Sequence, residues 1–304
     1  MDKTDETKPK GKAPAKAASG GGGLYFIKLT IDVAFKYIFG DLANLDLLKE
    51  LIKDITKLPI ERLEDLTFLP DELHRDSLTD HKTIVDVRAA LTDGEQIEVE
   101  MQIKDLHDMG KRSLYTWAKM YSAQLKKSGR YIDLKKCVCI NIVNFDYTKS
   151  ASGYSKKIVA DAQTKEAFMD EMEIHFVELT KREKVGDARL RKWMELFSAQ
   201  TWEDMAEVAK GDEVMRQVYE NAQKIAANAA KRLQVERREK FLIDQNTLEW
   251  YARTEGIEIG KAEGIPEGEQ KRAFAVAQRM LQKNRPIDEI SEFTGLSEDE
   301  IKGI

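Results

Sequence analysis

Three polar residues are spaced as in a divalent-metal site, within two segments that alternate between apolar and polar side chains. Asp86 lies in residues 84–88, and Glu100 and Gln102 lie in residues 97–103. Glu100 and Gln102 are two positions apart, so in a strand both side chains point to the same face. Paired strands lie about 4.5–5.5 Å apart, which lets an aspartate on one and a glutamate on the other share a Mg²⁺.

The register of the hairpin between these segments decides whether Asp86 joins the other two residues. Asp93-Gly94 lies between them and is a strong hairpin signal. A two-residue turn at this place leaves the side chain of Asp86 on the wrong face. A three-residue loop with a glycine bulge pairs Thr92 with Gln96 and places Asp86 opposite Gln102. The metal hypothesis therefore predicts a bulge or a longer turn.

The elements that must position this hairpin follow from the hydrophobic periodicity. Thr30 is the predicted N-cap of a first helix, and apolar spacing over residues 42–55 predicts a second. After the hairpin, a helix over residues 111–127 leads into an apolar strand at 137–145, whose crossover implies parallel pairing. A short loop and helix then precede a strand at 173–179. This order predicts a mixed α/β domain.

The C-terminal part of the chain is predicted to be entirely helical. A long helix is expected over residues 213–245, followed by a weak helix or hinge where glycine recurs every four residues between 256 and 268. Two short helices are expected in residues 271–304, with Ser297 and Glu300 as a capping box. We thus expect a disordered arm at 1–23, an α/β domain at 24–182 and a helical region at 183–304.

Composition excludes several classes of protein. The 304 residues carry 42% hydrophobic residues and a net charge of −5, which suits a folded chain of about two domains. No apolar run approaches the roughly 18 residues of a membrane span, and the first residues lack the apolar core of a signal peptide. We therefore expect a cytoplasmic protein. Cys137 and Cys139 are predicted to pack in the core, and the histidines show no metal-ligand spacing.

Several motifs occur in an order that has a known counterpart. They are DVAFK from Asp32, IVDVR from Ile84, IEVEMQ from Ile97, the helix that contains Arg112, and the terminal TGLS from Thr294. Together they resemble the PD-(D/E)XK nuclease family transposases, also called recombination-promoting nucleases. The resemblance implies a restriction-endonuclease-like core of mixed sheet and helices. It also implies DNA as the partner and Mg²⁺-dependent hydrolysis of phosphodiester bonds, with Mn²⁺ as a substitute.

The resemblance also implies roles for individual residues. Mg²⁺ held by Asp86, Glu100 and the backbone carbonyl of Met101 would polarise the scissile phosphate and activate a water. In the wider superfamily a lysine stands two residues after the glutamate and orients this water. Here that position is Gln102, which can hydrogen-bond the water but carries no charge. The family commonly has glutamine there.

Four further residues complete the candidate site. Asp32 is a candidate active-site residue, although a carboxylate in the first turn of a helix is also favoured by the helix dipole alone. Lys36 and Lys104 could compensate for the missing lysine, and together with Arg112 they are candidate DNA contacts.

The net charge hides two segments of opposite sign. Residues 41–80 contain eleven acidic and five basic residues, whereas residues 104–136 contain nine basic and three acidic ones. The basic segment follows the proposed metal carboxylates directly, so the acidic average does not exclude DNA. A solvated helix face would give the same pattern.

Two hypotheses from different classes follow. The first is a Mg²⁺-dependent DNA endonuclease, whose helical C-terminal region forms a homo-oligomer or positions DNA. The second is a catalytically inactive nuclease fold that acts as a self-associating interaction module, which Gln102 and the acidic net charge favour.

Overall fold

The computed structural model describes residues 24–70, 87–125 and 129–304, and the predicted disordered arm at 1–23 lies outside this part of the chain. The described residues form two compact units, which divide between Glu236 and Arg237. The division falls later than residue 183, and the predicted domain boundaries stay a prediction.

A six-stranded sheet forms the centre of the first unit, with strand order β1-β2-β3-β4-β6-β5. Its strands are β1 (Thr67–Phe68), β2 (Val87–Ala90), β3 (Gln96–Gln102), β4 (Cys137–Val143), β5 (Tyr154–Lys157) and β6 (Met172–Glu178). β3 pairs with β4 and β4 with β6 in parallel, whereas β1, β2 and β5 pair antiparallel with their neighbours. The predicted mixed sheet is therefore confirmed, including the parallel crossover from β3 to β4.

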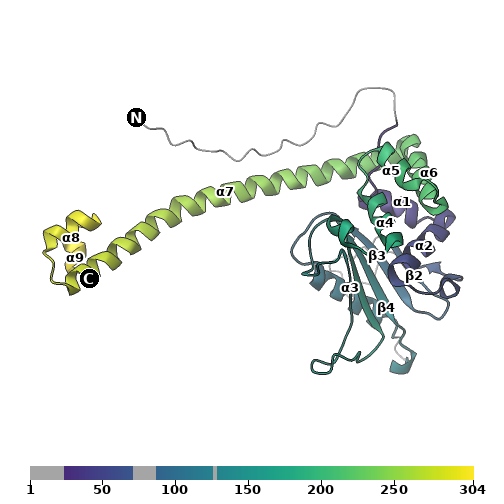
Figure 1. The fold of residues 1–304 in the computed structure, drawn as a ribbon, viewed down its shortest axis with the longest axis horizontal. Coiled ribbons are helices and arrows are strands. Elements are labelled where there is room, and N and C mark those ends of the chain that lie inside the picture. The colour runs from purple at the N-terminus through teal and green to yellow at the C-terminus, as the bar shows by residue number, and fades with distance from the viewer. Residues whose placement is uncertain (1–23, 71–86, 126–128) are drawn as a thin grey trace. The chain divides into compact units, whose positions relative to one another are not determined.

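Helices cover both faces of this sheet (Figure 1). In the first unit they are α1 (Asp32–Phe39), α2 (Leu45–Thr56), α3 (Met109–Ala123), α4 (Ala188–Ser198), α5 (Trp202–Ala209) and α6 (Glu213–Ala227). Short 3₁₀ helices occupy Leu42–Asn44, Ile60–Leu63, Tyr131–Asp133 and Leu179–Lys184.

Alternation along β4 divides the core into two layers. Cys137 and Cys139 point toward α3 and pack with its Met120, as predicted for cysteines in the core. Burial raises the pKa of the Cys137 thiol to about 12. The intervening residues face the opposite side, where helices α1 and α4 pack together through Phe39 and Trp193, whose ring centroids are 6.0 Å apart.

Three local predictions are wrong. Ile31 rather than Thr30 occupies the N-cap of α1, without a side-chain capping bond. Strand β5 stands where a helix was expected between β4 and β6. The helix predicted from 213 to 245 is divided at Asn228, because the Asn228 Oδ1 accepts hydrogen bonds from the N–H groups of Ala230 and Lys231 and so starts a new helix.

The second unit contains most of α7 (Ala229–Gln282), together with α8 (Ile287–Thr294) and α9 (Glu298–Lys302). α7 is one continuous helix through the glycine repeat and Pro266, where a weak helix or a hinge was expected. α8 and α9 pack through Ile290 and Ile301. The predicted capping box of Ser297 and Glu300 is confirmed.

None of the helices in the described part of the chain is both long enough and apolar enough to cross a membrane. The cytoplasmic location stays a prediction.

Candidate active site

The hairpin of β2 and β3 has a three-residue loop of Thr92, Asp93 and Gly94. The Gly94 N–H donates to the Leu91 carbonyl at 3.0 Å, and Gly94 adopts φ 88°, a conformation that glycine adopts without strain. The longer turn is therefore confirmed. The predicted pairing of Thr92 with Gln96 is wrong, because the loop contains Thr92 and Gln96 pairs with Ala90.

This register brings Glu100 next to the last described pair of the hairpin. Val87 pairs with Val99, and Glu100 follows Val99 on β3. Asp86, which precedes Val87 in the sequence, lies outside the described residues. The sequence hypothesis for Asp86 therefore stays a prediction.

Glu100 is a buried carboxylate, with 4% of its surface exposed. Burial raises its pKa, and the ion pair with Arg112 of α3 offsets that rise only in part. The negative charge of Asp108, at the N-cap of α3, raises the pKa further. Ionised Glu100 is thus short of compensating positive charge.

A polar pair on the neighbouring elements lies beside Glu100. Asn141 is its register partner on β4 and is fully buried. The Ser113 hydroxyl lies 2.8 Å from Asn141 Oδ1, and Asn141 Nδ2 donates to the His175 carbonyl at 3.1 Å. The sequence analysis missed Asn141 and Ser113. Asn141 had a signal, since it is the polar residue within the apolar run CVCINIV of β4.

Gln102 ends β3 on the same face as Glu100. Its Nε2 donates to the Lys104 carbonyl at 3.0 Å, so the amide is held in a fixed orientation just beyond the carboxylate. The Met101 backbone lies between the two residues. The structure thus brings together Glu100, Met101, Gln102 and Arg112 from the predicted set.

Two further predicted residues, Asp32 and Lys36, lie on α1. Asp32 is half-buried in the first turn, and its Oδ1 accepts a hydrogen bond from the Val33 N–H at 2.8 Å. Lys36 lines a separate surface hollow together with Lys231 of α7. Glu100 is not among the residues that line this hollow, and the DNA contact of Lys36 stays a prediction.

The described residues supply only part of the donor groups that the proposed metal site needs. No group of three or more His, Cys, Asp or Glu residues within the described ranges could hold a metal ion. Mg²⁺ often uses one or two carboxylates and keeps several waters. Glu100 and the Met101 carbonyl fit that chemistry if Asp86 supplies the second carboxylate.

The sequence model of the PD-(D/E)XK nuclease family transposases matches residues 29–252. The chain belongs to this family. The match covers the whole sheet and helices α1 to α6, and the mixed sheet flanked by helices is consistent with the PD-(D/E)XK nuclease fold. No curated protein and no solved structure matches the chain. Membership in the PD-(D/E)XK nuclease family suggests a hydrolase that acts on DNA.

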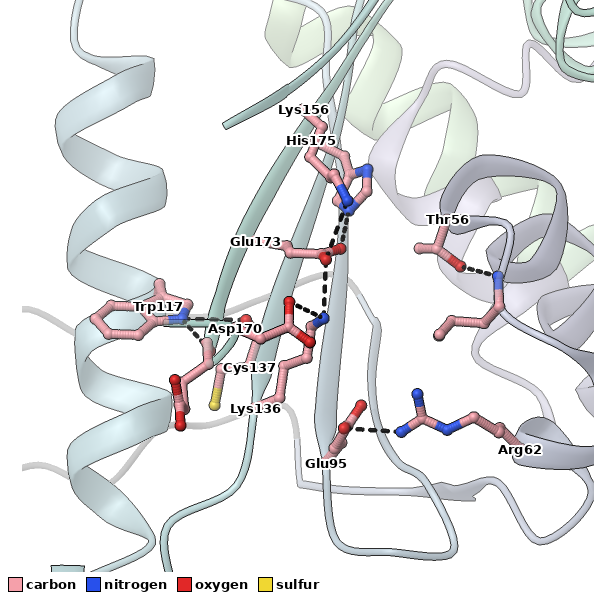
Figure 2. Close-up of polar contacts among 12 residues, drawn as sticks. Thr56, Arg62, Glu95, Trp117, Lys136, Cys137, Lys156, Asp170, Glu173 and His175 are labelled. Carbon is pink, nitrogen blue, oxygen red and sulfur yellow. Dashed lines mark hydrogen bonds and ion pairs between the residues drawn. The ribbon is translucent and has the colours of Figure 1, made fainter. Parts of the chain in front are cut away.

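This PD-(D/E)XK family member has a second buried carboxylate on the opposite face of the sheet. Glu173 accepts hydrogen bonds from Lys136 at 2.8 Å and Lys156 at 3.2 Å, and lies 3.0 Å from His175 Nε2 (Figure 2). The Tyr154 hydroxyl lies 3.0 Å from the other ring nitrogen of His175. Burial alone would raise the pKa of Glu173, but the hydrogen bonds from His175 and the lysines outweigh it and lower the pKa.

Proposed function

We propose that the protein is a Mg²⁺-dependent DNA endonuclease that hydrolyses phosphodiester bonds, with DNA recombination or transposition as its setting. The proposed metal ligands are Asp86, Glu100 and the Met101 carbonyl, and Mn²⁺ is the expected substitute. Family membership supports DNA as the substrate.

The observation that carries this proposal is the buried carboxylate of Glu100, which retains too little positive charge around it. Its pKa is raised although Arg112 contacts it directly. A divalent cation would supply the missing charge. Arg112 is 38% exposed at its side chain, so it can leave the carboxylate and turn toward solvent.

The chain's own residues then have distinct roles. The metal, when bound, supplies a Lewis acid that polarises the phosphate and lowers the pKa of a water. Gln102 orients that water by hydrogen bonding, since its Nε2 is already held by the Lys104 carbonyl. Arg112 and Lys104 contact the DNA phosphates, and Asp32 remains a candidate second acid on α1.

A cleavage assay tests the proposal directly. Supercoiled plasmid incubated with purified protein and Mg²⁺ or Mn²⁺ should be nicked or cut. Asp86→Ala and Glu100→Gln should each abolish this, while a chelator should stop the wild-type protein. Undiminished cleavage by either variant would overturn the site assignment.

A catalytically inactive interaction module is the second candidate function. It is favoured by the ion pair of Glu100 and Arg112, which satisfies one carboxylate oxygen, and by the absence of a lysine at position 102. Calorimetric titration with Mg²⁺, Mn²⁺ and Ca²⁺ separates the two, since no heat of binding with any ion would favour the inactive module.

We also propose that α7 mediates homo-oligomerisation. Ile243, Trp250 and Ile257 are seven residues apart and 48–61% exposed, and a seven-residue apolar spacing is typical of coiled-coil seams. The second copy of the chain would cover them. Light scattering should show that Trp250→Glu lowers the assembled mass, whereas Glu249→Gln should not change it.

A further inference from the structure

Residues of α1, α6 and the first turns of α7 line a polar groove. Figure 1 shows where these helices meet. It consists of two adjoining hollows of about 590 and 390 Å³. Tyr37, Asp41 and Lys231 line both hollows, so they form one continuous surface. All of its residues belong to the first compact unit.

Three lysines on three helices give this groove a positive charge: Lys36 on α1, Lys224 on α6 and Lys231 on α7. The Lys231 ammonium lies 4.9 Å from the centre of the Tyr37 ring. Asp41 is the acidic residue of the lining, and its carboxylate accepts a hydrogen bond from the Ala43 N–H.

Two of the groove lysines differ from the lysines of the first unit that pair with a carboxylate. Within the described residues, neither Lys224 nor Lys231 forms an ion pair with a carboxylate; Lys224 instead donates to Asn221 Oδ1 at 3.3 Å. Lys210, by contrast, is paired with Glu207. The ammonium groups of Lys224 and Lys231 are therefore available to an anion from outside.

The remaining lining is rich in hydrogen-bond donors of neutral side chains. These are the amides of Asn44, Asn221, Asn228 and Gln234. Ammonium and amide donors together suit phosphate oxygens. The three lysines are spread along the two hollows and do not converge on one point. The groove therefore suits successive phosphates of a nucleic-acid strand better than a single small anion.

We propose that this groove binds the phosphate backbone of duplex DNA, as a contact separate from the Glu100 site. The inference rests on the proposed function for the identity of the polyanion and adds a location and a set of residues to it. Sequence-independent contacts of this kind position DNA without specifying a base sequence.

Salt-dependent binding tests the groove without any cleavage. Anisotropy of a labelled DNA duplex should be measured with the full-length protein in EDTA at several salt concentrations. The double variant Lys224→Gln, Lys231→Gln should bind about tenfold or more weakly at low salt. Its negative slope of log K against log[salt] should become shallower by about 2, since each lost phosphate contact removes about 0.9 from its magnitude.

Matched variants make the outcome decisive. Lys210→Gln removes the same charge outside the groove and should leave the slope unchanged, and Lys231→Arg should retain wild-type binding. Lys224 is exposed on α6, so Lys224→Gln alone replaces the double variant if that variant does not fold. The single variant should make the negative slope shallower by about 0.9. Wild-type affinity and slope in the groove variants would overturn the proposal, as would no DNA binding by the wild type.

Glu100→Gln should abolish cleavage and keep this binding, so the two proposals can fail separately.

Discussion

Two buried glutamates on opposite faces of the same sheet have pKa values that are shifted in opposite directions. Glu100 on β3 has a raised pKa, because burial outweighs its contact with Arg112. Glu173 on β6 has a lowered pKa, because His175 and two lysines outweigh its burial. Both carboxylates are more than nine-tenths buried.

The difference separates a structural carboxylate from one suited to binding a cation. Glu173 already has its partners, so its ionised form stabilises the fold. Among the described residues, the ion-pair partner of Glu100 is the partially exposed Arg112, and the ionised form of Glu100 is costly until further positive charge arrives. A perturbed pKa of this kind is a feature of functional sites, and it supports Glu100 rather than Glu173 as the metal ligand.

The largest expected difference between the two glutamates is in catalysis. Glu100→Gln should lower the rate of metal-dependent DNA cleavage by about 10³-fold or more, because it removes a ligand whose charge holds the metal at the phosphate. Glu173→Gln, on the other face, should retain cleavage within a few fold at a temperature where it is folded. Plasmid nicking rates of the two variants measure this, and equal losses in both would contradict the assignment.

For stability we expect the opposite order, because Glu173→Gln should destabilise the protein more than Glu100→Gln. Glu173→Gln should lower the free energy of unfolding by about 2–3 kcal/mol, since it removes charged hydrogen bonds to Lys136, Lys156 and His175. Metal-free Glu100→Gln should lower it far less or raise it, because an unfavourable buried charge disappears. Urea unfolding at pH 7 is the measurement. Asp170→Asn is the control, since Asp170 also pairs with Lys136 but is 87% exposed, and it should change stability by less than about 1 kcal/mol.

The sequence predicted the parts of this site that depend on local spacing. The two-residue interval between Glu100 and Gln102 placed them on one face, and the apolar run of β4 with its crossover predicted a buried parallel neighbour. Asp93-Gly94 indicated the hairpin. This dipeptide did not determine the register of the β2–β3 hairpin, because the same residues allow loops of two or three residues with different closing pairs.

Contacts between distant segments could not be predicted in this way. The ion pair of Arg112 with Glu100 depends on how α3 packs over the sheet. Strand β5 was missed because its sequence, YSKK, lacks an apolar alternation and pairs only through its neighbour β6. Glu173 and His175 become partners because they are two positions apart on one strand, but the lysines that decide the pKa of Glu173 come from two other segments.

The third prediction tests whether Arg112 competes with the metal for Glu100. Arg112→Gln should strengthen Mg²⁺ or Mn²⁺ binding about tenfold, measured by calorimetry without DNA, because the guanidinium no longer occupies the carboxylate. Lys111→Gln removes the same charge from an exposed neighbour on α3 and should have a smaller effect. Weaker metal binding in Arg112→Gln would instead show that the arginine orients Glu100 for the metal.

The smallest expected effect is the pH dependence of the Glu173 contribution. The pKa of Glu173 is lowered in the folded state, so its stabilisation is fully present above the unfolded value of about 4.3 and is lost as the pH falls toward the folded value. The difference in unfolding free energy between wild type and Glu173→Gln should therefore shrink by about 1 kcal/mol between pH 5 and pH 3. Urea unfolding at these pH values measures it. A difference that stays constant would mean that Glu173 stabilises the fold by packing and neutral hydrogen bonds, and the electrostatic contrast with Glu100 would then rest on Glu100 alone.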